Sequence, residues 1–261
     1  MKQVTLPDGQ RVPALGMGTW NMGESPAARA EEIATLRLGL DLGLRLIDTA
    51  EMYGEGQSEA MIGEAISGRR DQAFLVSKVY PFNASRRGTV QACERSLQRL
   101  GTDRIDLYLL HWRGGVPLEE TVQAMEALQR DGKIRHWGVS NLDLSDMQEL
   151  WDVPGGGRGD LLPWLRQRGV PVMAYSPIEQ SRLLGHPGLK RFARDHGMSA
   201  AQAALAWLLA QDGVIAIPKT SRRERLQENL EALSKTLSPA QLAEIDRIFP
   251  PPDGPAPLEM L

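Results

Sequence analysis

The sequence has a single cysteine, Cys93, among its 261 residues. One thiol excludes an intrachain disulfide, a cysteine-based zinc site and an iron–sulfur cluster, and it is typical of a protein from a reducing compartment. Runs of one charge are also missing, since 30 basic and 33 acidic residues give a formal net charge of −3. This balance disfavours nucleic acid as a partner.

A hydrophobic run long enough to cross a membrane is missing as well. The longest apolar stretch, 200–210, includes Gln202 and falls short of the ~20 residues that a spanning helix needs. The first ten residues, MKQVTLPDGQ, lack the apolar core of a signal peptide. We therefore expect a cytoplasmic protein without a membrane partner.

The composition is that of a chain with a sizeable core, with 42% hydrophobic and 24% charged residues. A length of 261 residues is ordinary for one α/β barrel, so we expect a single domain over 1–261. The hydrophobic period alternates between strand-like and helix-like, which is typical of βα units around a parallel sheet. After a possible hairpin around Gly9, the expected strands are 14–20, 44–49, 73–78, 105–111, 135–140, 170–175 and 214–218.

Amphipathic stretches separate the expected strands. The expected helices are 27–42, 58–67, 85–100, 118–130, 144–151, 161–168, 199–211 and 222–233. Capping boxes pair Ser199 with Gln202 and Ser238 with Gln241, which predicts helix starts at both serines. The proline-rich tail from Pro250 fits neither helix nor strand.

One place breaks the alternation of strands and helices. The expected helices 144–151 and 161–168 are joined by a stretch that includes GGGRG at 155–159, and no strand fits between them. A closed barrel links its number of strands to their tilt and stagger. The sequence therefore predicts a (β/α)8 barrel that lacks one strand and keeps seven recognisable ones.

Polar residues stand at the carboxyl ends of six of the expected strands. They are Asp48, Lys78, His111, Ser140 with Asn141, Tyr175 with Ser176, and Lys219. In a parallel barrel these ends meet at one face, where active sites are built, so the pattern predicts one polar pocket. For any single residue the alternative stays open that the chain is simply leaving the core.

Three of these side chains, together with Tyr53 one loop beyond Asp48, form a candidate catalytic group. Asp48 and Lys78 are expected to pair at neighbouring strand ends, and a lysine beside the phenol of Tyr53 favours the phenolate and lowers the barrier to proton donation. His111 is expected opposite Tyr53, where an imidazole would hydrogen-bond a substrate oxygen. The alternative for His111 is a structural imidazole satisfied by the backbone.

Metal and nucleotide motifs are weak by comparison. The four histidines show neither HExxH nor close paired spacing, so no metal site is expected. The Gly16-Met17-Gly18 segment reaches Asn21 where a dinucleotide fingerprint needs glycine or alanine, and a Walker loop is absent. The cationic segment 219–223 enters a helix, an arrangement that attracts phosphate. Its alternative is a solvated basic helix start.

These residues resemble the aldo-keto reductases, especially small bacterial members that reduce methylglyoxal and similar aldehydes. The likeness covers nearly the whole chain, and its motifs are GMGTW at 16–20, LIDTAEMYGEGQSE at 46–59, LVSKV at 75–79, LGTDRIDLYLLHW at 100–112, GKIRHWGVSN at 132–141, PVMAYSP at 171–177 and IPKTSRRERLQEN at 217–229. The resemblance implies a (β/α)8 barrel that binds NADPH or NADP⁺ without a Rossmann domain and reduces small carbonyl compounds.

The resemblance also implies a role for each matching residue. The catalytic tetrad falls on Asp48, Tyr53, Lys78 and His111, with Tyr53 as the proton donor. The cofactor-binding residues would be Thr19, Trp20, Ser140, Asn141, Tyr175, Ser176, Lys219, Thr220, Arg225, Glu228 and Asn229, and the substrate pocket would be lined by Trp20 and Trp112. Within this set, Tyr175 would stack on the nicotinamide, and the cations would hold the 2′-phosphate of NADPH.

The apparent deletion is the departure from the family pattern. Family members have a strand at this point with a glutamine that contacts the nicotinamide carboxamide, and this sequence has neither. We expect reduced stability, self-association through an open sheet edge, and impaired reductase activity. Two alternatives stay open: an inactive barrel that binds NADP(H) or a protein partner, and a phosphate-binding barrel isomerase that uses Lys78 or His111.

Overall fold

The computed structural model describes residues 1–151 and 165–250. The chain divides into two compact units, each described here by itself. The central unit is Thr19–Arg158, and the split unit combines Met1–Gly18 with Gly159–Glu259. The expectation of one domain over 1–261 stays a prediction.

The central unit is built on four parallel strands. They are β4 (Leu46–Asp48), β5 (Phe74–Val79), β6 (Ile105–Leu110) and β7 (Ile134–Val139), paired in that order. The register places Asp48 opposite Val76, and Lys78 opposite Leu109. The strand ends that carry the predicted catalytic residues therefore lie at the same edge of this sheet.

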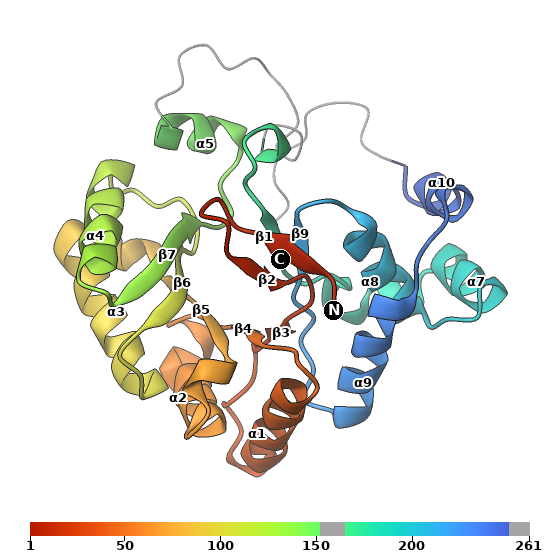
Figure 1. The fold of residues 1–261 in the computed structure, drawn as a ribbon, viewed down its shortest axis with the longest axis horizontal. Helices are drawn as coiled ribbons and strands as arrows, with labels where there is room; N and C mark the ends of the chain where they lie inside the picture. The colour runs from red at the N-terminus through yellow and green to blue at the C-terminus, as the bar shows by residue number, and fades with distance from the viewer. Residues whose placement is uncertain (152–164, 251–261) are drawn as a thin grey trace. The chain divides into compact units, whose positions relative to one another are not determined.

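Helices cover the outer side of these strands (Figure 1). They are α1 (Pro26–Asp41), α2 (Gln57–Ile66), α3 (Arg86–Leu100), α4 (Leu118–Arg130) and α5 (Leu144–Trp151), with the short 3-10 turns η1 (Tyr53–Gly56), η2 (Arg70–Gln72) and η3 (Pro81–Asn83). Successive helices from α1 to α4 contact one another. Helix α3 begins at Ser85, whose side chain accepts a hydrogen bond from the Gly88 amide, and ends at Gly101 with a φ of 61°.

The split unit starts with an antiparallel hairpin of β1 (Gln3–Thr5) and β2 (Arg11–Pro13), which confirms the hairpin expected around Gly9. Its other strands are β3 (Met17–Gly18), β8 (Val172–Ala174) and β9 (Val214–Ala216), and β8 pairs with β9 in parallel. Gly18 lies very close to the segment that follows β9. A Cβ atom at Gly18 would stand 2.7 Å from the carbonyl oxygen of Ile217. A side chain at this position would push the two segments apart.

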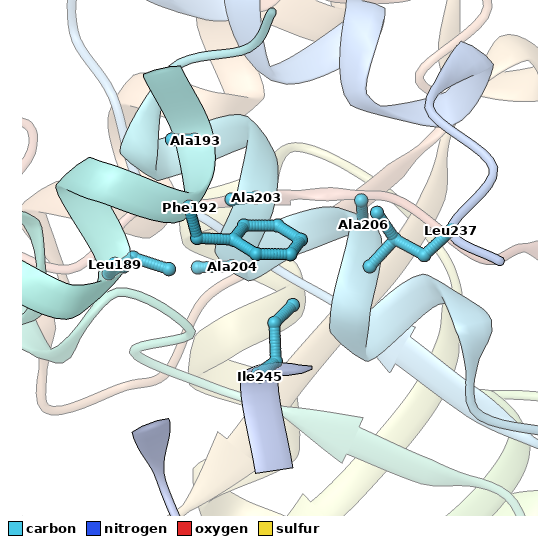
Figure 2. Packing of buried hydrophobic residues seen from close by; sticks show 8 residues of the cluster. All are labelled: Leu189, Phe192, Ala193, Ala203, Ala204, Ala206, Leu237 and Ile245. Carbon is cyan, nitrogen blue, oxygen red and sulfur yellow. The ribbon is translucent and has the colours of Figure 1, made fainter. Parts of the chain in front are cut away.

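A hydrophobic cluster of the split unit forms around Phe192 (Figure 2). The helices of this unit are α7 (Pro187–Asp195), α8 (Ala200–Ala210), α9 (Arg223–Glu231) and α10 (Pro239–Ile248), with the 3-10 turns η4 (Glu179–Ser181), η5 (Leu183–Gly185) and η6 (Ala232–Ser234), and α7, α8 and α10 contribute to the cluster. Small alanines of α8 let the Phe192 ring approach closely, and Leu237 and Ile245 close the cluster. The capping boxes at Ser199 and Ser238 are both formed, as predicted.

The seven expected strands all occur at their expected places, and most expected helices occur within a few residues of theirs. Helix α7 was not expected, although Pro187 at its first turn and apolar Leu189, Phe192 and Ala193 are helix signals. The helix expected at 161–168 lies in the described residues only at 165–167. The GGGRG junction at 155–159 and nearly all of the tail lie outside the described residues.

Candidate active site

The predicted tetrad lies at the carboxyl ends of three strands of the central sheet and in the segment that follows β4. Asp48 ends β4, Lys78 lies one residue before the end of β5, and His111 directly follows β6. The backbone continues the parallel pairing past the strands, because the His111 amide donates to the Val79 carbonyl at 3.1 Å and the Glu51 amide donates to the Lys78 carbonyl at 3.2 Å. The loops therefore leave the sheet in a fixed order.

The Lys78 ammonium is the centre of this group. Its Nζ lies 2.7 Å from Asp48 Oδ1, and it donates to the Thr49 carbonyl at 2.7 Å and to Tyr53 Oη at 3.3 Å. The ammonium thus forms one ion pair, with Asp48, and donates two hydrogen bonds. Because Lys78 and Asp48 are both buried, the charge of Lys78 is directed at these partners rather than at water.

Burial and attraction compete in setting the pKa values of this pair. Burial is the largest influence on Asp48 and raises its pKa, while the neighbouring Lys78 lowers it only in part. Burial lowers the pKa of Lys78, but the charge of Asp48, the Tyr53 phenol and their hydrogen bonds together raise it. The lysine is therefore held in its charged form, with one N–H directed at the phenol oxygen.

His111 is a neutral imidazole in this site. Its side chain is buried, and burial together with the charge of Lys78 lowers its pKa to about 3. The imidazole lies edge-on to the Tyr53 ring at 5.8 Å between ring centroids. Its Nδ1 is buried and has no hydrogen-bond partner in the described part of the chain. A neutral imidazole carries one N–H, so His111 is suited to donating a hydrogen bond to a polar ligand atom beside Tyr53.

The buried neutral state of His111 predicts a loss of stability in acid. Because the unfolded histidine has its ordinary pKa of 6.5, the unfolded chain binds one more proton than the folded chain between pH 6.5 and about 3. The free energy of unfolding should therefore fall with decreasing pH in this window, by at most about 1.4 kcal/mol per pH unit from this group. Urea unfolding of the His111→Gln variant should show this part of the slope removed.

The unaltered protein, unfolded by urea at the same pH values, is the reference for this pH experiment. Equal slopes for the unaltered protein and the His111→Gln variant would contradict the assignment of His111 as a buried neutral imidazole.

Asn141 joins the tetrad from the loop after β7. Its Nδ2 donates to the backbone carbonyl of His111 at 3.0 Å, and its backbone has a φ of 54°. Its Oδ1 is buried and accepts no hydrogen bond from the described residues. An orphaned buried oxygen is costly, so this position is suited to an external N–H donor. Ser140 precedes it, and its amide donates to the Leu110 carbonyl at 2.8 Å.

A buried hydroxyl network lies beneath the tetrad. Thr19 Oγ1 donates to the Asp48 carbonyl at 2.8 Å, and Ser58 Oγ donates to Thr19 Oγ1 at 2.9 Å. Thr49 Oγ1 donates to Ser58 Oγ at 3.2 Å. The hydroxyl of Thr19, a predicted cofactor residue, is thus committed to holding Asp48. Ser58 was missed by the sequence analysis, although it lies within the GEGQSE motif.

The two tryptophans predicted for the substrate pocket differ in their surroundings. Trp112 lies 4.9 Å from the His111 ring and 5.3 Å from the Tyr80 ring, measured between centroids. Trp20 is 38% exposed on the loop that precedes α1. Trp112 is therefore directly connected to the tetrad by ring contacts, and Trp20 offers an open apolar surface.

The remaining predicted cofactor residues belong to the split unit. Tyr175 follows β8, is 36% exposed and has a pKa raised by burial, and Ser176 has a φ of 46°. The exposed Lys219 and Arg225 lie after β9 and in α9. Three further predicted residues, Thr220, Glu228 and Asn229, occur in the same segment, where Thr220 Oγ1 accepts from the Arg222 amide at 3.1 Å and Asn229 is buried.

The sequence predicted no metal site, and the described part of the chain was searched for one. Residues 1–151 and 165–250 hold no group of three or more His, Cys, Asp or Glu side chains placed to bind a metal ion. Over the same residues, no helix is long and apolar enough to cross a membrane.

The fold and the site together define an aldo-keto reductase. Residues 14–155 and 158–249 match the aldo/keto reductase family, and the chain belongs to that family. The family fold is an α/β (β/α)8 barrel.

Among its relatives is the methylglyoxal reductase YeaE of Escherichia coli, with 49% identity over 281 residues, which covers 100% of this chain and 99% of the relative. A glyoxal reductase of Bacillus subtilis is 33% identical over 270 residues and 96% of each chain. The crystal structure of an aldo/keto reductase from Klebsiella pneumoniae in complex with NADP and acetate has a TM-score of 0.94 with 48% identity, over 100% of this chain and 99% of the other.

Proposed function

We propose that this protein is an NADPH-dependent reductase of methylglyoxal and other small aldehydes. The observation that carries the proposal is the arrangement of Tyr53, Lys78, Asp48 and His111, in which a charged buried lysine donates to the phenol oxygen and a neutral imidazole lies beside the phenol ring. The names of the methylglyoxal and glyoxal reductases among the relatives support the substrate class.

The residues present fit a bound nicotinamide cofactor. The orphaned Oδ1 of Asn141 is an acceptor for a carboxamide N–H, and Ser140 would complete this contact. Tyr175, with its partly exposed ring, would stack on the nicotinamide, and Thr19, Trp20 and Ser176 would also belong to the cofactor-binding residues. Lys219, Thr220 and Arg225 would hold the 2′-phosphate, and Glu228 and Asn229 would contact the adenine. A guanidinium beside the phosphate favours NADPH over NADH.

The protein's own groups control the proton in this reaction. When bound, NADPH supplies a hydride from C4 of its nicotinamide ring to the carbonyl carbon of the substrate. Tyr53 gives its proton to the carbonyl oxygen, and Lys78 stabilises the phenolate that remains. Asp48 holds Lys78 in place. His111, being neutral, donates a hydrogen bond to the same substrate oxygen and fixes its position. Trp20 and Trp112 line the space for the small substituent.

The test is oxidation of NADPH by the purified protein in the presence of methylglyoxal. Consumption of NADPH together with formation of the alcohol supports the proposal. Binding of NADPH without turnover would favour the second candidate function, a catalytically inactive barrel that binds NADP(H) or a protein partner. Conversion of a sugar phosphate without any nicotinamide would favour the isomerase alternative.

The second candidate is favoured by signs of a missing strand between α5 and β8. The two matched segments of the family are interrupted at Gly156 and Gly157. The alignment with the Escherichia coli relative extends over 281 positions and includes all 261 residues of this chain, so at least 20 positions, 281 less 261, lack a residue from it. A barrel strand with its turns has about this length.

The two strands that would flank the missing one support the same interpretation. Within the described residues, β7 pairs only with β6 and β8 pairs only with β9. All three residues of β8 are half-buried, and in β7 only Ile134 is buried. In contrast, β4, β5 and β9 are buried throughout. The chain would therefore be a seven-stranded variant of the family barrel, with sheet edges that invite pairing with a second copy.

The proposed loss of a strand predicts a less stable and more associated protein. Compared with the Escherichia coli relative, the chain should melt at a lower temperature and elute as dimers or aggregates in size-exclusion chromatography, because unpaired strand edges are exposed. Its reductase rate should be lower, since a displacement of about 1 Å near the nicotinamide costs on the order of 100-fold. A monomer with the melting temperature of that relative would contradict this prediction.

A further inference from the structure

A row of aromatic rings runs from the tetrad to the protein surface. His111 lies 5.8 Å from Tyr53 and 4.9 Å from Trp112, measured between ring centroids. Trp112 lies 5.3 Å from Tyr80, and Tyr80 lies 5.7 Å from Phe82. Phe82 is 85% exposed. The rings thus form a continuous series of contacts from the phenol of Tyr53 to a side chain that stands almost entirely in solvent.

The outer end of this row is carried on a turn with a fixed backbone. Residues 80–83, here called the 80–83 turn, begin with the Tyr80 amide, which donates to Glu51 Oε1 at 2.7 Å. Asn83 Nδ2 donates to the same oxygen at 3.0 Å. One side-chain oxygen therefore holds both ends of the turn. The other oxygen of Glu51 lies 3.6 Å from Nη2 of Arg95, whose side chain is about half exposed.

The opposite side of the turn is closely packed. A Cβ atom added to Gly114, on the loop after β6, would stand 2.7 Å from Cβ of Pro81, so the absence of a side chain lets Pro81 approach. Thr89 Oγ1 donates to the Asn83 carbonyl at 3.3 Å. The exposed Phe82 therefore stands on a turn that several contacts fix. A single exposed apolar side chain is common, but this one continues the row of aromatic rings that begins at Tyr53.

We propose that the 80–83 turn is a substrate-selecting wall and that Phe82 contacts the far end of carbonyl substrates with a two-ring apolar substituent. This inference rests on the proposed reductase function. The size of the substituent follows from the spacing of the rings. From His111 through Trp112 and Tyr80 to Phe82, successive ring centroids are 4.9, 5.3 and 5.7 Å apart. A one-ring substituent would reach Trp112 and Tyr80, and a second ring would be needed to reach Phe82. Glu51 is the positioning residue of the turn.

The experiment compares kcat/KM for 2-naphthylglyoxal with kcat/KM for methylglyoxal. Phe82→Ala should lower the ratio of the two values about tenfold, the size expected for the loss of one aromatic contact with its buried area. Glu51→Ala should lower the ratio similarly, because the Tyr80 amide loses its acceptor. Glu51→Gln keeps a side-chain oxygen at that place and should retain the ratio. Leu42→Ala, an exposed apolar residue after α1, is the matched surface control and should also retain it.

A ratio that Phe82→Ala leaves unchanged would overturn the proposal, and a ratio lowered equally by Glu51→Gln and Glu51→Ala would overturn the positioning role of Glu51. A binding measurement separates these outcomes from a failure of the proposed function. In the presence of NADP⁺, calorimetry with the unreactive 2-naphthoate should give an affinity about tenfold weaker for Phe82→Ala, with acetate as the small reference anion. This measurement tests whether Phe82 contacts a two-ring ligand even if the unaltered protein reduces no carbonyl compound.

Discussion

The Tyr53→Phe variant is expected to reduce methylglyoxal with a kcat lowered about 10²- to 10⁴-fold, the contribution of a positioned general acid. The change removes one oxygen, which accepts the hydrogen bond from Lys78 Nζ at 3.3 Å, and leaves the ring beside His111. Because the Asp48–Lys78 pair is kept, the folded structure and NADPH binding should be little changed. Steady-state kinetics with fluorescence titration of NADPH measure both quantities.

Tyr108 provides a matched control for this substitution. It lies in β6, three residues before His111, and its side chain is fully buried in the core. Tyr108→Phe removes the same atom from the same residue type outside the tetrad and should retain the kcat of the unaltered protein. A Tyr53→Phe variant that is as active as Tyr108→Phe would exclude Tyr53 as the proton donor.

Asp106→Ala is expected to lower the free energy of unfolding by about 3–5 kcal/mol, the cost of breaking a buried ion pair from one side. The Asp106 carboxylate is buried near the start of β6, at the opposite end of the sheet from the tetrad. Its Oδ2 accepts from Arg70 Nη2 at 2.7 Å and from the Leu75 amide at 2.9 Å, and its Oδ1 lies 3.2 Å from Arg135 Nη1. Removing it leaves the Leu75 amide without its acceptor and the partly buried Arg70 guanidinium without its carboxylate partner.

Asp71→Ala is the control for this stability measurement. Asp71 pairs with Arg104 but is 91% exposed, so its removal should have little effect on the urea midpoint. Each variant, once folded, should retain the kcat of the unaltered protein, since groups at this end of a parallel sheet serve stability and those at the carboxyl end serve chemistry. Equal urea midpoints for the two variants would contradict the role given to Asp106.

The strands and most of the tetrad could be predicted because short stretches of the sequence indicate them. Asp48, Lys78 and His111 each follow a short apolar run, so the position of the strand fixes the position of the polar residue. Tyr53 follows no strand directly and was proposed as the phenol nearest to Asp48 and Lys78 along the chain, and the resemblance to a family then gave it the role of proton donor. The structure then supplied the contacts of Lys78 and the neutral state of His111, which depend on burial.

Residues that act on a distant backbone were not predicted. The Glu51 carboxylate accepts from the Tyr80 amide, and the Ser58 hydroxyl donates to Thr19 Oγ1. The hydrophobic periodicity of a sequence does not indicate contacts between segments so far apart. Helix α7 was missed because its few apolar residues stand among charged ones in a short segment. The identity of the residues that support a site thus depends on packing, which one sequence does not specify.

The central claim is that Tyr53, Lys78, Asp48 and His111 serve hydride transfer from NADPH to a carbonyl carbon. The most direct test uses NADPH deuterated at C4 of the nicotinamide, with methylglyoxal as the substrate and mass spectrometry of the alcohol. The account predicts one deuterium on the former carbonyl carbon in the unaltered protein, with Tyr53→Phe forming this product at a greatly reduced rate. An alcohol without deuterium, or a product formed equally fast by both proteins, would contradict it.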